Sequence, residues 1–271
     1  MRGLAECHFR WNGQIKIVNF LISNSFFRTY KIKNHWHDKS FFTALLLPFS
    51  FLFLFFSVIR KFLYEKRIFR VEKIDLPVIV IGNITVGGTG KTSTVIWLAN
   101  HLKERGLNVG ILCSGYGADN NKYPIQITLD SNAYQVGDEA VHIFRRTGCV
   151  VVSCKHRVKS ARFLKQNFAI DVLICDDGLQ HYQLMRDIEI HVVNGEKRFG
   201  NRYFLPAGPL REPLRRLRDI DLKISKGAPK NGEYSLTYRP DYVYALSLPS
   251  KVKPLTFFKD TEIVAVAGIA N

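Results

Sequence analysis

The stretch VIVIGNITVGGTGKTSTVIWLA, residues 78–99, decides how this chain folds. It begins with a short run of β-branched residues at 78–81 and continues through a glycine-rich loop. The i, i+3, i+4, i+7 spacing that places side chains on one helix face is then met by Val95, Leu98, Ala99 and Leu102. Gly106 is suited to ending such a helix. The stretch therefore predicts a buried strand, a loop and a helix over residues 91–105.

The loop has the composition of a phosphate-binding P-loop, with the residues Gly87, Gly88, Thr89, Gly90, Lys91 and Thr92. Glycines let the backbone turn its N–H groups toward phosphate oxygens, and the helix start adds partial positive charge. Lys91 can reach the β- and γ-phosphates of ATP, and the Thr92 hydroxyl can ligate Mg²⁺. The strict pattern requires glycine where this chain has Thr85. The strand–loop–helix context nevertheless favours nucleotide binding over a chance glycine-rich turn.

Strand-like and helical segments alternate after the loop. Strands are predicted at residues 109–113, 149–153, 171–175 and 188–193, and helices at 138–146 and 157–168. This alternation predicts an α/β fold of the P-loop NTPase type, a mostly parallel sheet with helices on both faces. After Asp219 the pattern weakens, leaving candidate strands at 242–248 and 263–266.

Acidic residues follow two of these predicted boundaries. Asp176 and Asp177 end the apolar run at 171–175, where a carboxylate can hold Mg²⁺ directly or through water. Asp-Asp-Gly is also common in surface turns. Asp138 and Glu139 open a predicted helix, where their spacing favours complementing the helix dipole over a catalytic base. His181 lies shortly after the acidic pair, so we expect it close to the phosphates.

The bulk composition indicates an anionic partner. Lys and Arg number 39 against 23 Asp and Glu, giving a formal charge of +16. Many of the 20 Phe residues cluster near the N-terminus, which favours a membrane over nucleic acid. A loose basic region, either a solvated face or a site for anionic groups, contains Arg198, Arg202, Arg211, Arg215, Arg216 and Arg218. The five cysteines include no Cys-x-x-Cys, which argues against a zinc site or disulfide framework and favours a reducing cytosol.

The sequence FFTALLLPFSFLFLFFSVI, residues 41–59, carries no charge and is flanked by basic residues. A secretory signal is disfavoured because no small-residue cleavage site follows. A buried core helix would be unusually rich in Phe and Leu. We therefore expect a membrane-inserted or interfacial helix, which Pro48 would kink, consistent with a shallow anchor or a full span. Residues 1–40 are mixed and basic without a clear period.

Four segments together resemble the tetraacyldisaccharide 4'-kinase family, the lipid A 4'-kinases of Gram-negative bacteria. They are VIVIGNITVGGTGKT at 78–92, GDEA at 137–140, DVLICDDGLQHYQLMRDIEI at 171–190 and FLPAGPLREPL at 204–214. The resemblance implies transfer of the γ-phosphate of ATP to the 4'-hydroxyl of tetraacyldisaccharide 1-phosphate, with Mg²⁺. It implies a membrane anchor over residues 1–75 and a kinase domain over 76–271.

The resemblance also assigns residues and partners. It implies that the catalytic residues are Lys91, Asp138, Asp176 and Asp177. Asp138 is implied to be the base or its partner. The implied metal ligands are Thr92, Asp176 and Asp177. Substrate contacts fall on Arg157, His181, Arg211 and Glu212. The implied partners are the lipid A disaccharide precursor and lipids of the bacterial inner membrane at its cytoplasmic face. We expect a monomer and no nucleic-acid partner.

This chain departs from the family pattern in several places. The family's Ser-Arg-Gly-Tyr-Gly is replaced by Cys113, Ser114, Gly115, Tyr116 and Gly117, and its Pro by Ala140. Residues 1–34 do not resemble the family. The sequence also ends before the family's Pro-Asp-His-His segment, and this second departure predicts a truncated chain. Two alternatives therefore remain: a membrane-associated P-loop ATPase, and an inactive remnant that binds nucleotide and membrane.

Overall fold

The computed structural model describes residues 4–11, 14–21, 36, 41–115, 123–238, 242–245 and 248–259. The chain forms two compact units. The first comprises Met1–Leu63, Ile84–Val86 and Phe199–Leu214, and the second comprises Tyr64–Asn83, Gly87–Arg198 and Arg215–Asn271. The predicted division into residues 1–75 and 76–271 stays a prediction.

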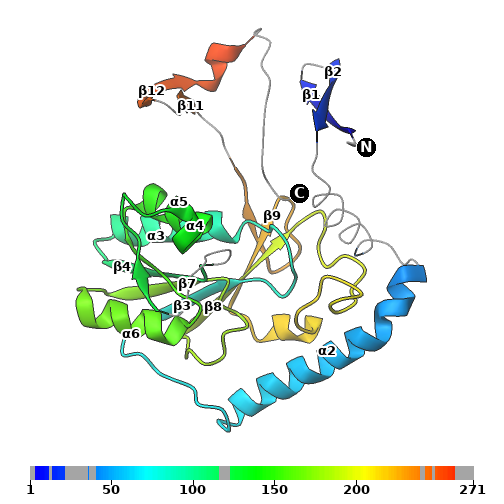
Figure 1. Cartoon of the computed structure of the whole chain (residues 1–271), viewed down its shortest axis with the longest axis vertical. Coiled ribbons are helices and arrows are strands. Elements are labelled where there is room, and N and C mark those ends of the chain that lie inside the picture. Colours follow the sequence, from blue (N-terminus) through cyan, green and yellow to red (C-terminus); the bar gives the residue numbers. More distant parts are fainter. Residues whose placement is uncertain are drawn as a thin grey trace. The chain divides into compact units, whose positions relative to one another are not determined.

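The second unit is built on an eight-stranded sheet (Figure 1), in the order β10-β9-β8-β3-β7-β4-β6-β5. All neighbours are parallel except β5 and β6. Its strands are β3 (Val78–Gly82), β4 (Val109–Cys113), β5 (Ile125–Gln126), β6 (Val150–Ser153), β7 (Val172–Asp176), β8 (Ile188–Asn194), β9 (Leu222–Lys226) and β10 (Tyr234–Leu236). The predicted α/β class with a mostly parallel sheet is confirmed. The short strands β5, β9 and β10 were not predicted.

Helices cover both faces of this sheet (Figure 1). Helices α3 (Lys91–Glu104) and α5 (Asp138–Thr147) lie on one face, with the short α4 (Ala133–Val136) beside α5, and α6 (Arg157–Asn167) lies on the other. The bounds of α3, α5 and α6 lie within two residues of the predicted helices, whereas α4 was not predicted. Helix α5 ends at Gly148, which adopts φ 62°, a left-handed conformation that glycine tolerates without strain.

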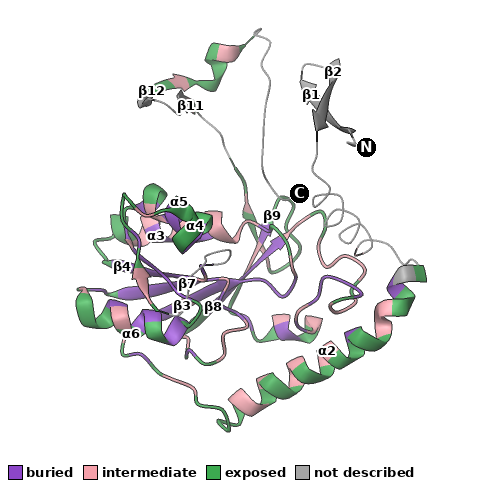
Figure 2. Ribbon diagram, viewed as in Figure 1, coloured by how far each residue is buried: buried purple, intermediate pink, exposed green. Residues whose placement is uncertain are grey.

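The core follows the two-residue period of the strands. Ile111 and Ile174 point to the α3–α5 face and join one buried cluster with Val95 and Ala99 of α3. Gly110, next to Ile111 in β4, lies on the opposite face, where an added Cβ would lie 3.0 Å from Leu164 of α6. Strands that are apolar on both faces explain the continuous hydrophobic runs in the sequence, and Figure 2 shows them buried.

The first unit contains a hairpin and one long helix. Strands β1 (Leu4–Trp11) and β2 (Gln14–Leu21) pair antiparallel, and α2 spans Phe41–Glu65, continuing through Pro48. The hairpin was not predicted, although its sequence carries a signal: Ala5, Cys7, Phe9 and Trp11 alternate with polar residues, and Asn12-Gly13 is a favoured two-residue hairpin turn. The predicted helix over 41–59 is confirmed and is longer at its C-terminal end. Within the described residues, Thr43–Glu65 is the one stretch long and apolar enough, by length and composition, to cross a membrane.

The C-terminal part of the second unit has less regular structure. It contains the 3₁₀ turns η1 (Leu214–Arg218), which starts at the boundary of the units, and η2 (Leu255–Phe258), and the antiparallel strands β11 (Tyr242–Ala245) and β12 (Leu248–Pro254). The candidate strand at 242–248 contains β11 and ends at the first residue of β12, whose remaining residues were not predicted. The candidate strand at 263–266 lies outside the described residues, as do Tyr116 and Gly117.

Candidate active site

The loop between β3 and α3 has the backbone that phosphate binding needs. Gly87 has φ 124° and Gly90 φ 97°, both in the left-handed region that favours glycine. The carbonyl of Gly90 accepts hydrogen bonds from the backbone N–H and the hydroxyl of Thr94, each at 3.0 Å. No described side chain caps α3 at its N-terminus. The N–H groups of its first turn are therefore positioned for an anionic ligand.

The hydroxyl of Thr89 lies inside this loop. The side chain is buried, and its Oγ1 atom has no hydrogen-bond partner among the described residues. A buried hydroxyl without a partner is uncommon in proteins, because it loses its bonds to water. A phosphate oxygen would satisfy it.

Lys91 lies next to the acidic pair. Strand β7 pairs with β3, so Asp176 at the end of β7 lies opposite Ile81 at the end of β3. The Nζ of Lys91 lies 3.5 Å from Oδ1 of Asp177, which has φ 47°. Such a φ is uncommon outside glycine and turns the chain sharply after the strand. The predicted neighbouring strand that ends in two carboxylates is thus confirmed.

Asp176 is the most strongly perturbed of these acids. Its side chain is 3% exposed, and its Oδ1 atom has no hydrogen-bond partner among the described residues. Burial, followed by repulsion from Glu139 and Asp177, raises the pKa of Asp176 to about 7, although Lys91 and Arg157 oppose the shift. Partial desolvation, with Asp138 and Asp177 nearby, likewise raises the pKa of Glu139 against the effect of Lys91. The raised pKa values mean that ionising these carboxylates is unfavourable here without a further cation, even beside Lys91.

The donor set suits Mg²⁺. No group of three or more His, Cys, Asp or Glu side chains within the described residues forms a metal site by itself. Mg²⁺ usually takes only one or two carboxylates, with waters and phosphate oxygens completing six oxygen ligands. The unpartnered oxygen of Asp176, the neighbouring Asp177 and the hydroxyl of Thr92 in the first turn of α3 fit that pattern.

Arg157 supports the acidic pair from α6. Its guanidinium is buried and donates to the carbonyl of Cys154 at 2.9 Å and to that of Asp176 at 2.8 Å. Both bonds fix backbone, and the predicted contact of Arg157 with substrate stays a prediction. Asp138 is exposed at the start of α5, where its Oδ1 accepts the N–H of Glu139 at 2.9 Å. Its position agrees with a helix-terminal role and leaves the carboxylate accessible.

The remaining predicted residues divide between the units. His181 lies in the second unit, in the loop after Asp177, together with the phosphate loop, Asp138 and Arg157. Arg211 and Glu212 lie in the first unit, where the N–H of Arg211 donates to the carbonyl of Ile84 at 2.7 Å. Sequence reasoning missed Glu139 as a member of the acidic cluster. Its position beside Asp138 was the available signal.

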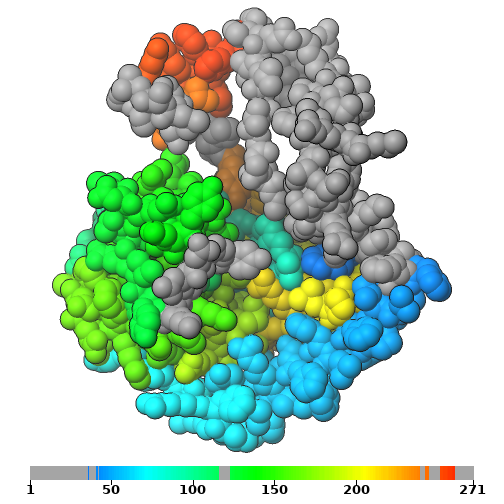
Figure 3. All heavy atoms as spheres, viewed as in Figure 1, coloured from blue at the N-terminus to red at the C-terminus, as the bar shows by residue number. Residues whose placement is uncertain are grey.

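Helix α2 has two opposite faces of different character. Its buried face carries Thr43, Ser50 and Ser57 at seven-residue intervals, and Ser50 donates to the carbonyl of Phe204 at 2.7 Å. Ser57 donates to the carbonyl of Arg211 at 3.2 Å. The other face is an exposed apolar stripe at i+3 and i+4 spacing, formed by Phe41, Leu45, Phe49, Leu52, Phe56 and Ile59. Figure 2 shows exposed residues along the length of α2, and Figure 3 shows α2, in blue, at the surface.

This arrangement inverts the usual amphipathic helix, because the polar side chains contact protein and the apolar ones face outward. An exposed apolar stripe of this length is typical of surfaces that contact a membrane or another apolar partner. The hydrogen bonds from Ser50 and Ser57 tie the helix to residues 204–211, next to two of the predicted substrate residues.

Comparisons with known proteins agree with this geometry. Residues 42–271 match the LpxK family, described as tetraacyldisaccharide-1-P 4'-kinase. The tetraacyldisaccharide 4'-kinase of Nitrosococcus oceani is 45% identical over 240 residues, which cover 89% of this chain and 71% of the relative. The same-named protein of Coxiella burnetii (strain RSA 331) is 41% identical over 242 residues, 89% of this chain and 71% of the relative.

A solved structure shows the same fold. LpxK from Aquifex aeolicus, in a crystal structure in complex with ATP, superposes with a TM-score of 0.70 at 30% identity. The match covers 82% of this chain and 72% of that one. The resemblance found in the four sequence segments is thus confirmed over most of the chain. This chain belongs to the tetraacyldisaccharide-1-P 4'-kinase family.

Proposed function

We propose that this chain transfers the γ-phosphate of ATP to the 4'-hydroxyl of tetraacyldisaccharide 1-phosphate, a step of lipid A biosynthesis. Family membership supplies the reaction. The observation that carries it to this chain is the placement of Lys91 3.5 Å from Asp177, between an uncapped helix N-terminus and a buried, unpartnered carboxylate oxygen. These groups are the ones that phosphoryl transfer requires.

Each predicted residue then has a physical task. The N–H groups of residues 87–92 and the Lys91 ammonium hold the β- and γ-phosphates and offset the charge that spreads over the transferring group. Thr92, Asp176 and Asp177 would hold Mg²⁺, which supplies further positive charge at the phosphates when bound. Asp138 is the candidate base for the proton of the 4'-hydroxyl.

The chemistry of the lipid acceptor accounts for the predicted substrate-contacting residues and for the apolar stripe. Its 1-phosphate and sugar hydroxyls call for charged and polar contacts, which we assign to Arg157, His181, Arg211 and Glu212. Four acyl chains leave a bilayer only at a cost of about 0.8 kcal/mol per CH₂ group. The enzyme must therefore work at the membrane, and the apolar stripe of α2 supplies the contact. Because ATP is cytosolic, we place the chain at the cytoplasmic face of the inner membrane.

A transfer assay tests the reaction directly. Purified protein is incubated with Mg²⁺, ATP labelled on the γ-phosphate and tetraacyldisaccharide 1-phosphate in detergent micelles. Label on the lipid is the expected result. Release of phosphate without lipid labelling would instead identify an ATPase, and nucleotide binding with neither outcome would identify an inactive remnant.

The double variant Phe49→Glu, Phe56→Glu is expected to shift the protein from the vesicle-bound to the soluble fraction. The two side chains are 60% and 63% exposed on the apolar stripe, and charge there opposes burial in lipid. Co-sedimentation with phospholipid vesicles measures the change. Phe257→Glu is the matched control, because Phe257 is 58% exposed on η2 and lies outside the stripe. Equal vesicle binding by the double variant and the control would contradict the anchor.

A further inference from the structure

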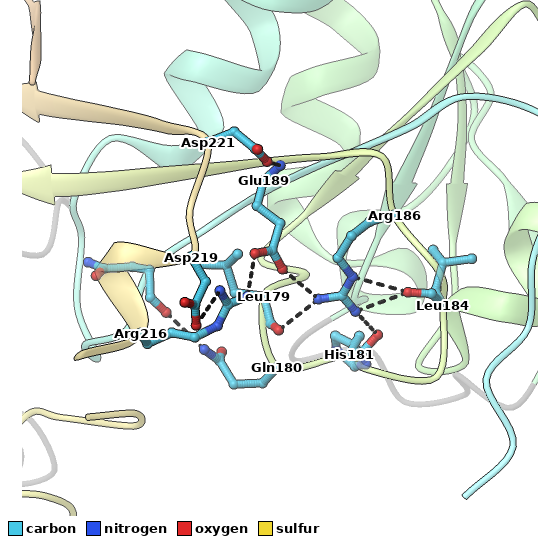
Figure 4. A network of polar contacts seen from close by, with 10 residues as sticks. Leu179, Gln180, His181, Leu184, Arg186, Glu189, Arg216, Asp219 and Asp221 are labelled. Carbon is cyan, nitrogen blue, oxygen red and sulfur yellow. Dashed lines mark hydrogen bonds and ion pairs between the residues drawn. The ribbon is translucent and has the colours of Figure 1, made fainter. Parts of the chain in front are cut away.

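The loop that follows the acidic pair is wrapped around one guanidinium group, that of Arg186 (Figure 4). Arg186 donates from Nη1 to the carbonyl of Leu179 at 3.0 Å and from Nη2 and Nε to that of Leu184 at 3.0 and 3.1 Å. Nη2 also donates to the carbonyl of His181. Three carbonyls of one short loop therefore share a single cation.

Backbone hydrogen bonds to Glu72 hold the end of the loop: the N–H of Glu72 donates to the carbonyl of Gln183 at 2.8 Å, and its carbonyl accepts the N–H of Met185 at 2.9 Å. The N–H of Gly178 donates to Ile81 at 3.2 Å, that of His181 to Gly178 at 2.9 Å and that of Leu184 to His181 at 3.2 Å. Without the guanidinium, the carbonyls of Leu179 and His181 would lose charge-assisted bonds in a partly buried setting, which is costly. Arg186 thus fixes the backbone at Leu179 and His181, in the part of the loop that the pairing with Glu72 does not reach.

The guanidinium is itself held in place by a buried carboxylate. Glu189, on β8, accepts from Nη1 of Arg186 at 3.0 Å with one oxygen and from Arg216 with the other. The side chains of Arg186, Glu189 and Arg216 are 12%, 10% and 6% exposed. The N–H of Glu189 donates to Asp221 at 2.8 Å, which fixes its backbone (Figure 4). Buried networks of charged groups held by several bonds restrict side chains to one geometry.

The acidic pair does not depend on these hydrogen bonds of Arg186 in the same way. Asp176 belongs to β7, where it is held by the ladder to β3 and by Arg157 at its carbonyl. Arg186 therefore holds the part of the loop that carries His181. Asp176, on the nucleotide side of the site, is held separately by β3 and Arg157.

We propose that Arg186 is a positioning residue for His181, and through it for binding of the lipid acceptor. This rests on the proposed function, which assigns His181 to that substrate. A lysine at position 186 keeps the charge near Glu189 but lacks the planar fork that reaches three carbonyls, so the loop loses its fixed path. The variant Arg186→Lys therefore separates the charge of Arg186 from its geometry.

Equilibrium binding of tetraacyldisaccharide 1-phosphate in detergent micelles tests the proposal, with ATP affinity and transfer measured on the same samples. Arg186→Lys is expected to raise the Kd for the lipid about tenfold and to leave ATP affinity within about twofold. In a His181→Ala background the same exchange is expected to change the lipid Kd by less than about twofold, because the effect passes through His181. Arg105→Lys is the matched control, because Arg105 is exposed at the C-terminal end of α3, where it contacts His101.

Glu189→Gln is a second variant, which weakens the ion pair that holds the Arg186 guanidinium and leaves Arg186 itself unchanged. A smaller loss of lipid affinity is expected, again with ATP affinity retained. Unchanged lipid affinity in both variants, an equal loss in the His181→Ala background, or a parallel loss of ATP affinity would overturn the proposal. A wild-type protein that binds the lipid without transferring phosphate would refute the proposed function and leave this comparison of affinities valid. A wild-type protein that does not bind the lipid would refute both.

Discussion

Replacing Lys91 by alanine abolishes transfer of phosphate to the lipid, with an expected loss in kcat of about a thousandfold or more. The Lys91 ammonium faces the acidic cluster from the first turn of α3, 3.5 Å from Asp177. It serves both the bound phosphates and the charge that develops during transfer, so its loss acts on the transition state more than on nucleotide binding. Single-turnover kinetics with labelled ATP and the disaccharide lipid measure the effect.

Lys165→Ala is the control for Lys91→Ala, because it removes a lysine from a solvent-exposed pair with Asp75. We expect near-normal transfer from this control, since exposed ion pairs contribute little. The P-loop assignment fails if Lys91→Ala transfers phosphate at a near-normal rate while the protein remains folded. Lys91→Arg is informative as well, because a larger planar cation retains the charge but not the compact geometry that the phosphates meet.

The central strands could be predicted from sequence because they are buried on both faces. Residues 78–81 and 109–113 are continuous apolar runs, and β3 and β4 occupy almost those bounds. The outer strands could not be found in this way. Strand β9 reads LKISK and β10 has three residues, so neither carries the continuous hydrophobic signal of a central strand. Strands β1 and β2 differ from β9 and β10, because apolar residues alternate with polar ones over residues 5–11 and Asn12-Gly13 is a favoured hairpin turn, so their sequence did carry a signal.

The site was predictable where chemistry follows from local order. A strand, glycines, lysine and threonine in sequence specify a phosphate loop, and two carboxylates at the end of an apolar run specify a metal site. The sequence could not show that Asp176 is buried while Asp177 contacts Lys91, since this depends on the turn after β7. It could not show that Arg157 and Arg186 bind backbone carbonyls either, because burial of a basic residue depends on the packing of distant segments.

Asp176→Asn is expected to lower transfer by about a hundredfold or more and to weaken the response of the rate to Mg²⁺. The carboxylate oxygen without a protein partner is the natural metal ligand, and an amide oxygen carries no charge to offset the ion. Titration of the rate with Mg²⁺ at fixed ATP measures the change. Asp171→Asn is the comparison variant at the other end of the same strand, where Asp171 accepts the N–H of Asn108.

The same substitution tests the pKa of Asp176 in the metal-free protein. Burial raises that pKa from 3.8 to about 7, so between these values the folded state keeps a proton that the unfolded state has released. The free energy of unfolding of the wild type therefore decreases as pH rises from about 4 to about 7, by roughly 1.4 kcal/mol per unit of pKa difference. Asp176→Asn cannot ionise, so at pH 8 without Mg²⁺ we expect it to unfold at a higher temperature than the wild type, with the two curves converging near pH 4. Wild type and variant melting in parallel across this range would mean that Asp176 is already ionised in the folded protein, and Mg²⁺ would then find its ligand charged at any pH above about 4.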